Sequence, residues 1–403
     1  MPLPDGFRTI DFDTYHRVEL PALLATGRAA HVARATAGLP TLAVCVSDGR
    51  AYTYRPRTGG IDIVAGEAEA STVLEINVEA WQGLVHELEA PAGLLYAGRV
   101  RCVRGNAVDF MAWESALRAL YNGRPPYDPD RVELADRAGM RLDINRTFSR
   151  ANDRGDMADF LRVAGYLFVR AVFSAGEAER FLAEAEELRH EARPGDKLSW
   201  WGKNAAGDTV LCRVTRGNAK PSLAALRSDA RVLALKDLAD AQFVYKRGEG
   251  EGAAVIYKQP DMIEGLGDLP WHRDCGMGGH AVMCPTLVVS VYLTEASPEN
   301  GELTMLPGSK DAAFNAHDPN QRGALRSAHF HARPGDVSLH YSDTVHAAPP
   351  PTARGRTRYR VSAVLTFARP DARHHRGRQS YNDVLHQRAD GQVEHLVDVA
   401  KRL

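Results

Sequence analysis

Cysteine is scarce in this sequence, and long apolar runs are missing. The chain has five cysteines in 403 residues, and no two are spaced as in a zinc knuckle or a thioredoxin-like site. A small, odd number of thiols is typical of a reducing compartment. Because the N-terminus also lacks the basic and apolar regions of a signal peptide, we expect a cytoplasmic protein. No uncharged apolar run reaches the roughly 18 residues that a membrane-spanning helix needs.

A surplus of charge of either sign is missing as well. Lys and Arg number 50 and Asp and Glu number 51, which gives a net charge of −1. Proteins that bind nucleic acids or anionic membranes usually concentrate basic charge, so neither partner is expected, and a small molecule is the expected ligand. Hydrophobic residues make up 44% of the chain, which is enough for a sizeable core.

Three stretches of different character follow one another. In residues 1–130 the patterns predict strands at 42–47, 71–78 and 94–104 and helices at 79–89 and 107–121. Residues 131–160 are polar and charged, which predicts a linker with a short helix. The third stretch, residues 161–403, opens with a strand at 165–173 and a helix at 174–192. Ser174 and Glu177 occupy the positions of a capping box in the first turn of that helix.

Short strands broken by glycine and proline make up most of the third stretch. Strand patterns occur at residues 209–214, 242–247, 253–258, 286–293, 303–306, 328–332, 336–340 and 358–368. Many short strands at this spacing predict an all-β sandwich or barrel, here with flanking helices. The predicted fold class of the whole chain is therefore α+β and mainly β.

The strongest functional signal is the sequence WHRD at residues 271–274. His272 and Asp274 lie two positions apart, and in a strand such residues point to the same face, where both can hold one metal ion. His346 is the natural third ligand, and His340, in the strand before it, is a rival. Two histidines and one carboxylate leave three positions open on an octahedral iron, which suits a chelating co-substrate and O2. The alternative is a structural His-x-Asp pair without a metal.

A strand that carries arginines follows His346. By alternation, Arg358, Arg360 and Ser362 share one face of this strand. An arginine that points to the same interior as an iron is costly to bury unless it meets an anion. The far carboxylate of 2-oxoglutarate would be such an anion, held by two parallel hydrogen bonds. The alternative is that these arginines line a solvated edge strand.

Together these segments resemble the phytanoyl-CoA dioxygenase family. The resemblance covers residues 165–369 and rests on WHRD, on the block NG…PGS at residues 300–309, and on the sequences RPGDVSLHYSDTVH and RTRYRVSAVLTFA. It implies a double-stranded β-helix, or jelly roll, with flanking helices. It also implies that the protein requires Fe(II), 2-oxoglutarate and O2.

The resemblance implies roles for individual residues. It places His272, Asp274 and His346 on the iron and an arginine on the distal carboxylate of 2-oxoglutarate. Alignment of the last strand by its terminal Phe-Ala makes Arg360 that arginine, with Arg358 as the alternative. Halogenating relatives have a small residue in place of the carboxylate, so Asp274 favours hydroxylation.

Three further polar side chains are candidates for binding the co-substrate. Family members often have a lysine near the position of Lys258, although an exposed edge-strand lysine is an equal alternative. Ser362 shares the predicted face of Arg360. Thr304 follows the Asn-Gly block, and a place in the core or in solvent is as well supported for its side chain.

Residues 20–125 resemble the sterol carrier protein type-2 family. The match consists of the sequence LEI at 74–76, EAW at 79–81, and GRVRCVRGN at 98–106 before the predicted helix. It implies an α+β domain that encloses an apolar tunnel for lipids or acyl chains, and hence a hydrophobic or acyl-linked substrate. An N-terminal domain used only for packing or oligomerisation is the alternative.

The sequence therefore predicts a dioxygenase that hydroxylates a small metabolite. Its parts are a sterol-carrier-like domain at 1–130, a linker at 131–160 and a catalytic domain at 161–403. Two other functions stay open. One is a cupin-like iron enzyme that does not use 2-oxoglutarate, and the other is a lipid carrier with a vestigial oxygenase domain.

Overall fold

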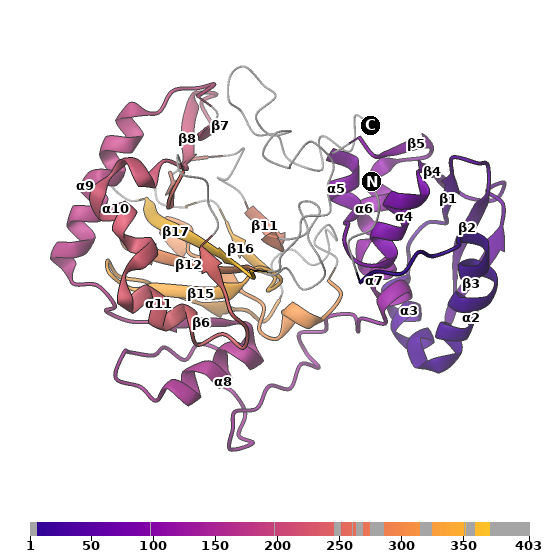
Figure 1. The fold of residues 1–403 in the computed structure, drawn as a ribbon, viewed down its shortest axis with the longest axis horizontal. Coiled ribbons are helices and arrows are strands. Elements are labelled where there is room, and N and C mark those ends of the chain that lie inside the picture. Colours follow the sequence, from indigo (N-terminus) through magenta and orange to yellow (C-terminus); the bar gives the residue numbers. More distant parts are fainter. Residues whose placement is uncertain are drawn as a thin grey trace.

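Two lobes make up the structure, each with its own hydrophobic core (Figure 1). The structure is a computed structural model that describes residues 6–96, 98–196, 198–245, 251–259, 261–262, 269–274, 286–314, 325–349, 351 and 359–370. We call residues 6–122 the N-terminal lobe, residues 123–130 the connecting segment, and the described residues from 131 to 370 the C-terminal lobe. Within the described residues, no helix combines the length and apolar character needed to cross a membrane.

A five-stranded sheet forms one layer of the N-terminal lobe. Its strand order is β3-β2-β1-β4-β5, and β1 and β4 run parallel while all other neighbours are antiparallel. The strands are β1 (Leu42–Val46), β2 (Ala51–Arg57), β3 (Gly60–Ala65), β4 (Thr72–Ile76) and β5 (Val100–Arg104). The sequence patterns predict β1 and β4 but miss the hairpin of β2 and β3, whose arginines and proline obscure the alternation.

Helices cover one face of this sheet. They are α1 (Phe12–Thr14), α2 (Leu20–Leu23), α3 (Ala29–Ala35), α4 (Val78–Val85), α5 (Pro91–Tyr96), α6 (Ala107–Ala112) and α7 (Glu114–Asn122). Large side chains fill the space between helices and sheet, and Phe12, Trp81, Phe110 and Trp113 are fully buried there. These side chains occupy the interior, where an enclosed lipid tunnel would lie, and the likeness to sterol carrier protein stays a prediction.

Two expected elements of the N-terminal lobe differ in the structure. The strand predicted at 94–104 begins only at Val100, because Pro91 starts helix α5 and Gly98, with a φ of 61°, reverses the chain after it. The helix predicted at 107–121 is divided at Trp113, which ends α6 and precedes α7.

Two sheets form the core of the C-terminal lobe. The major sheet has the order β6-β15-β12-β17-β10-β8-β7, with β9 paired to β17, and the minor sheet has the order β11-β16-β13-β14. The strands of the major sheet are β6 (Tyr166–Val169), β7 (Ser199–Lys203), β8 (Thr209–Val214), β9 (Val244–Tyr245), β10 (Ala254–Lys258), β12 (Thr286–Tyr292), β15 (Val337–Tyr341) and β17 (Arg360–Ala368). Those of the minor sheet are β11 (Leu269–His272), β13 (Thr304–Met305), β14 (Ala328–His329) and β16 (His346–Ala348).

Helices flank these sheets, as expected for this lobe. They are α8 (Arg154–Ala164), α9 (Ala175–Glu191), α10 (Pro221–Ala225) and α11 (Ala230–Lys236). Figure 1 shows α9, α10 and α11 together on one side of the strands. The lobe is thus mixed α/β with a β-rich core, which is consistent with the predicted jelly roll.

The two faces of the major sheet have different neighbours. On the outer face, the hydroxyl of Tyr257 donates to the carbonyl of Ala185 in α9. On the inner face, Lys258 and its cross-strand partner Arg360 point toward the minor sheet, where Lys258 donates to the carbonyl of Ala348. The inner face is therefore the one on which a site between the two sheets can form.

Residues 131–160 belong to the core of the C-terminal lobe. Leu142, Ile144 and Phe148 are buried in it, although a polar linker would be expected to stay in solvent. The Phe148 amide donates to the Phe168 carbonyl at 2.8 Å, so this segment extends the major sheet beyond β6. Its few apolar residues are enough to hold it there.

Candidate metal centre

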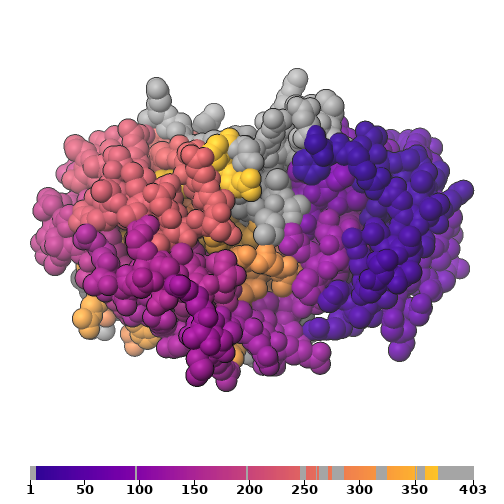
Figure 2. Space-filling model, turned by 60° about the horizontal axis from the view of Figure 1, so that its bottom comes forward, coloured from indigo at the N-terminus to yellow at the C-terminus, as the bar shows by residue number. Residues whose placement is uncertain are grey.

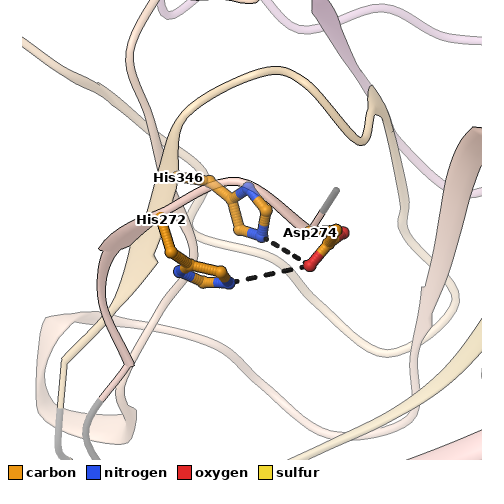
Figure 3. A group of neighbouring side chains, drawn as sticks. All are labelled: His272, Asp274 and His346. Atoms are coloured by element: carbon orange, nitrogen blue, oxygen red, sulfur yellow. Dashed lines mark ion pairs between the residues drawn. The ribbon is translucent and has the colours of Figure 1, made fainter. Parts of the chain in front are cut away.

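Strand pairing brings the three expected ligands together. His272 ends β11 and pairs directly with His346, the first residue of β16, so both imidazoles point to the same face of the minor sheet. Asp274 follows two residues after His272, and its amide donates to the carbonyl of Ser342 at 3.0 Å. Figure 3 shows the three side chains converging on one point.

The distances in this cluster suit a single metal ion. Nε2 of His272 and Nε2 of His346 each lie 3.6 Å from Oδ1 of Asp274. One ligand atom from each of the three residues lies within 4.8 Å of the others. Two ligands bound at about 2.1 Å lie at most about 4.2 Å apart, so small side-chain movements complete the contacts.

The ionisation of the cluster also suits a metal. Burial, together with the neighbouring His272 and His340, lowers the pKa of His346 to about 3, so its imidazole is neutral near pH 7. Nδ1 of His346 donates to the carbonyl of Thr344 at 2.9 Å, which leaves the lone pair of Nε2 directed at the cluster. Burial raises the pKa of Asp274, but the surrounding histidines outweigh this and hold its pKa well below the usual value.

Arg360 is buried on the inner face and has no counterion within the part of the chain that the structure describes. Its side chain is 4% exposed, its Nε has no hydrogen-bond partner, and it forms no ion pair with any described residue. Burial lowers the pKa of its guanidinium, while the neighbouring Tyr292 and Glu302 partly oppose this shift. A buried, unpaired guanidinium needs an anion, and a carboxylate of a bound molecule would supply one.

Comparison with known proteins identifies this lobe. The family described as phytanoyl-CoA dioxygenase (PhyH) matches residues 161–358 of the chain. The matched segment belongs to the phytanoyl-CoA dioxygenase family. Enzymes of this family use Fe(II) and 2-oxoglutarate with O2, so the chain is a 2-oxoglutarate-dependent non-haem iron enzyme. We call the matched lobe the phytanoyl-CoA dioxygenase domain.

Solved structures resemble this domain more distantly. AviO1 from Streptomyces viridochromogenes is 23% identical, with a TM-score of 0.44 over 56% of this chain and 98% of that one. The 2-oxoglutarate-dependent epimerase SnoN of nogalamycin biosynthesis is 22% identical, with a TM-score of 0.45 over 57% and 86%. HygX from Streptomyces hygroscopicus, with nickel and 2-oxoglutarate bound, is 21% identical, with a TM-score of 0.40 over 55% and 88%. No curated protein gives a significant match.

Lys258 lies beside Arg360 in the dioxygenase domain. It is fully buried, and β10 is paired on both sides, so the exposed edge-strand alternative does not apply. Gly301 makes room for it, because a Cβ at Gly301 would lie 3.0 Å from the Lys258 chain and 2.7 Å from the carbonyl of Pro349. Two buried cations thus share the inner face.

The other predicted residues fall in three different places. Ser362 is buried on the inner face, next to Arg360. Thr304 points to the opposite face from His346, because its neighbour Met305 is the residue that pairs with His346. Arg358 lies outside the described residues, so the choice between Arg358 and Arg360 rests on Arg360 alone.

Two residues near the cluster make contacts that the sequence patterns did not predict. Arg273, between two expected ligands, is 6% exposed and donates to the carbonyls of Ser309, at 2.9 Å, and Ala312. It thereby ties the cluster to the loop after the Pro-Gly-Ser sequence. His340 is 2% exposed, and its Nε2 lies 3.5 Å from Oδ2 of Asp274.

Proposed function

We propose that the phytanoyl-CoA dioxygenase domain oxidises an unactivated C–H bond of a small, hydrophobic or acyl-linked metabolite, with hydroxylation as the outcome. His272, Asp274 and His346 would hold Fe(II), and Arg360 would bind the distal carboxylate of 2-oxoglutarate. The observation that carries the proposal is Arg360, which is buried and has no ion-pair partner among the described residues, on the sheet face that also carries His340 beside the cluster.

The cluster supports this chemistry through its donor set. Two imidazoles, of which that of His346 is neutral near pH 7, and one carboxylate match the ligands of non-haem iron oxygenases and leave positions open for other molecules. When bound, iron with 2-oxoglutarate and O2 supplies the oxidising power that cleaves a C–H bond. The protein contributes by holding the reactants and excluding water. Because Asp274 keeps a carboxylate in the set, hydroxylation is favoured over halogenation.

The two buried cations support the use of 2-oxoglutarate. Arg360 offers a planar pair of donors that fits a carboxylate, and Lys258 adds positive charge from the neighbouring strand. In a cupin-like enzyme that does not use 2-oxoglutarate, Arg360 would be buried with no ion-pair partner among the described residues. The burial of Arg360 therefore favours the 2-oxoglutarate enzyme.

The decisive experiment is a binding titration of Arg360→Leu. Under anaerobic conditions with Fe(II), the wild type is expected to show the visible charge-transfer band of bound 2-oxoglutarate. The variant is expected to bind 2-oxoglutarate about 100-fold more weakly and to keep its affinity for iron, since a buried charge pair is worth several kcal/mol. Arg131→Leu, at an arginine whose side chain is 75% exposed, is the matched control.

The outcomes separate the candidate functions. Unchanged metal-dependent activity in Arg360→Leu would favour the cupin-like enzyme. A wild type that binds lipid but neither iron nor 2-oxoglutarate would favour the carrier with a vestigial oxygenase domain.

A screen for succinate release tests the substrate class. Acyl-CoAs, sterols and free amino acids are each added with 2-oxoglutarate, and the products are examined by mass spectrometry. An acyl-linked or apolar compound is expected to stimulate succinate release and to gain one oxygen atom. Stimulation by free amino acids alone would contradict the proposed class.

A further inference from the structure

His340 lies on the inner face of the major sheet, directly beside the cluster. It belongs to β15, a strand between β12 and β6, and pairs with Val288 on one side and Tyr166 on the other. Its side chain is almost fully buried, so solvent does not satisfy the imidazole. Its ring centroid lies 4.5 Å from that of His346.

Both ring nitrogens of His340 are buried without a hydrogen-bond partner among the described residues. Buried polar atoms in folded proteins nearly always have partners, so an orphaned imidazole needs an explanation. The nearest acceptor to Nε2 is Oδ2 of Asp274, at 3.5 Å. A small movement would convert this approach into a hydrogen bond.

The two oxygens of Asp274 have different neighbours. Oδ1 lies 3.6 Å from Nε2 of His272 and 3.6 Å from Nε2 of His346, whereas Oδ2 faces His340. An ion held by the two histidines would therefore meet Oδ1. The orientation of Oδ2 then depends on the group that binds it on the side away from His272 and His346.

His340 is poorly placed to be a fourth ligand. The group of ligand atoms within 4.8 Å of one another contains His272, Asp274 and His346, but not His340. Ligands of one ion at about 2.1 Å cannot lie further apart than about 4.2 Å. The imidazole is thus close enough to bind the carboxylate and too far away to complete the ligand set.

We propose that His340 is a positioning residue that donates from Nε2 to Oδ2 of Asp274. This hydrogen bond would hold Oδ2 on the side of His340 and leave Oδ1 facing His272 and His346, where it would be available to a metal ion. Groups that bind the ligands of a metal in this way typically change its affinity by about 10- to 100-fold. The inference rests on the proposed function, because it assumes that the cluster holds a metal.

The test compares His340→Leu with His340→Gln, using Co(II) as an optical probe of the site. Leucine removes the donor, whereas glutamine keeps an amide N–H. His340→Leu is expected to bind Co(II) at least tenfold more weakly than the wild type and to show an altered Co(II) absorption spectrum. His340→Gln is expected to restore most of the affinity and the wild-type spectrum. His190→Leu, at an exposed histidine of α9, is the control.

Each other outcome overturns the inference in a distinct way. Wild-type affinity and spectrum in His340→Leu would show that His340 does not position Asp274. Loss of all Co(II) binding in both variants, to the level of His272→Ala, would make His340 a ligand. If glutamine fails to restore what leucine removes, the hydrogen bond is not the cause. A wild type that binds no Co(II) would instead overturn the proposed function itself.

Discussion

At the scale of single residues, burial decides what the polar groups near the cluster can do. A neutral His346 binds metal more readily than a protonated one, and its burial keeps it neutral. Arg360 is also buried and forms no ion pair with any residue that the structure describes, which supports its proposed role in binding an anion. The chemistry proposed for the domain thus depends on the burial of His346 and Arg360.

His16 in the N-terminal lobe gives a prediction for the pH dependence of stability. Burial lowers its pKa from the usual 6.5 to about 4, and its ring nitrogens contact the carbonyl of Phe12 and the hydroxyl of Tyr54, each at 2.7 Å. The unfolded chain binds this proton more readily than the folded chain does. The stability that neutral His16 contributes is therefore complete above pH 6.5 and is lost as the pH falls toward 4.

Urea unfolding at pH 7 and pH 5 measures this effect. The wild type is expected to lose about 2 kcal/mol more than His16→Gln over this interval, because the variant lacks the titrating group. Other groups titrate in both proteins, so the difference isolates His16. Equal losses in the two proteins would contradict the pKa shift.

At the scale of elements, strand patterns were more reliable where strands are long and paired on both sides. The pattern at 209–214 corresponds to β8 and that at 286–293 to β12, within one residue at the end. The three-residue strand β16 was missed, because it is too short to show alternation and forms only by pairing with β11 and β13. Its first residue is nevertheless the expected ligand His346.

The capping box of α9 was confirmed in both of its hydrogen bonds. The Ser174 side chain accepts from the Glu177 amide, and the Glu177 side chain accepts from the Ser174 amide at 2.9 Å. Replacement Ser174→Ala is expected to lower the free energy of unfolding by about 1 kcal/mol, because one helix-terminal amide loses its acceptor. Urea unfolding measures the change, and Ser47→Ala, at an exposed serine, is the control. An equal effect of both substitutions would contradict a capping role.

At the scale of the whole molecule, the connecting segment joins the two lobes close to the metal cluster. Tyr127 is buried, its amide donates to the Ala313 carbonyl at 2.6 Å, and its hydroxyl donates to the Pro307 carbonyl at 3.0 Å. It packs in a small core with Leu306 and Val345, the residue before His346. Figure 2 shows the indigo N-terminal lobe side by side with the C-terminal lobe.

This contact predicts that Tyr127 supports the metal cluster from the side of the N-terminal lobe. Tyr127→Ala is expected to lower the free energy of unfolding by about 3 kcal/mol and to weaken metal binding, because it leaves a cavity behind Val345. Tyr127→Phe, which loses only the hydroxyl, is expected to cost about 1 kcal/mol. Urea unfolding and Co(II) titration measure the two effects. Unchanged Co(II) affinity in Tyr127→Ala would mean that the connecting segment does not support the site.

The sequence by itself determined the features that depend on near neighbours. The spacing of His272 and Asp274, the capping box of α9 and the alternation of the longer strands are local, and the family resemblance rests on the same short segments. Only the tertiary structure decided which distant residues meet them. The register of β11 on β16 places His346 opposite His272, and the pairing of β10 with β17 buries Arg360 beside Lys258. Such pairings depend on contacts between segments far apart in the chain, which local spacing does not encode.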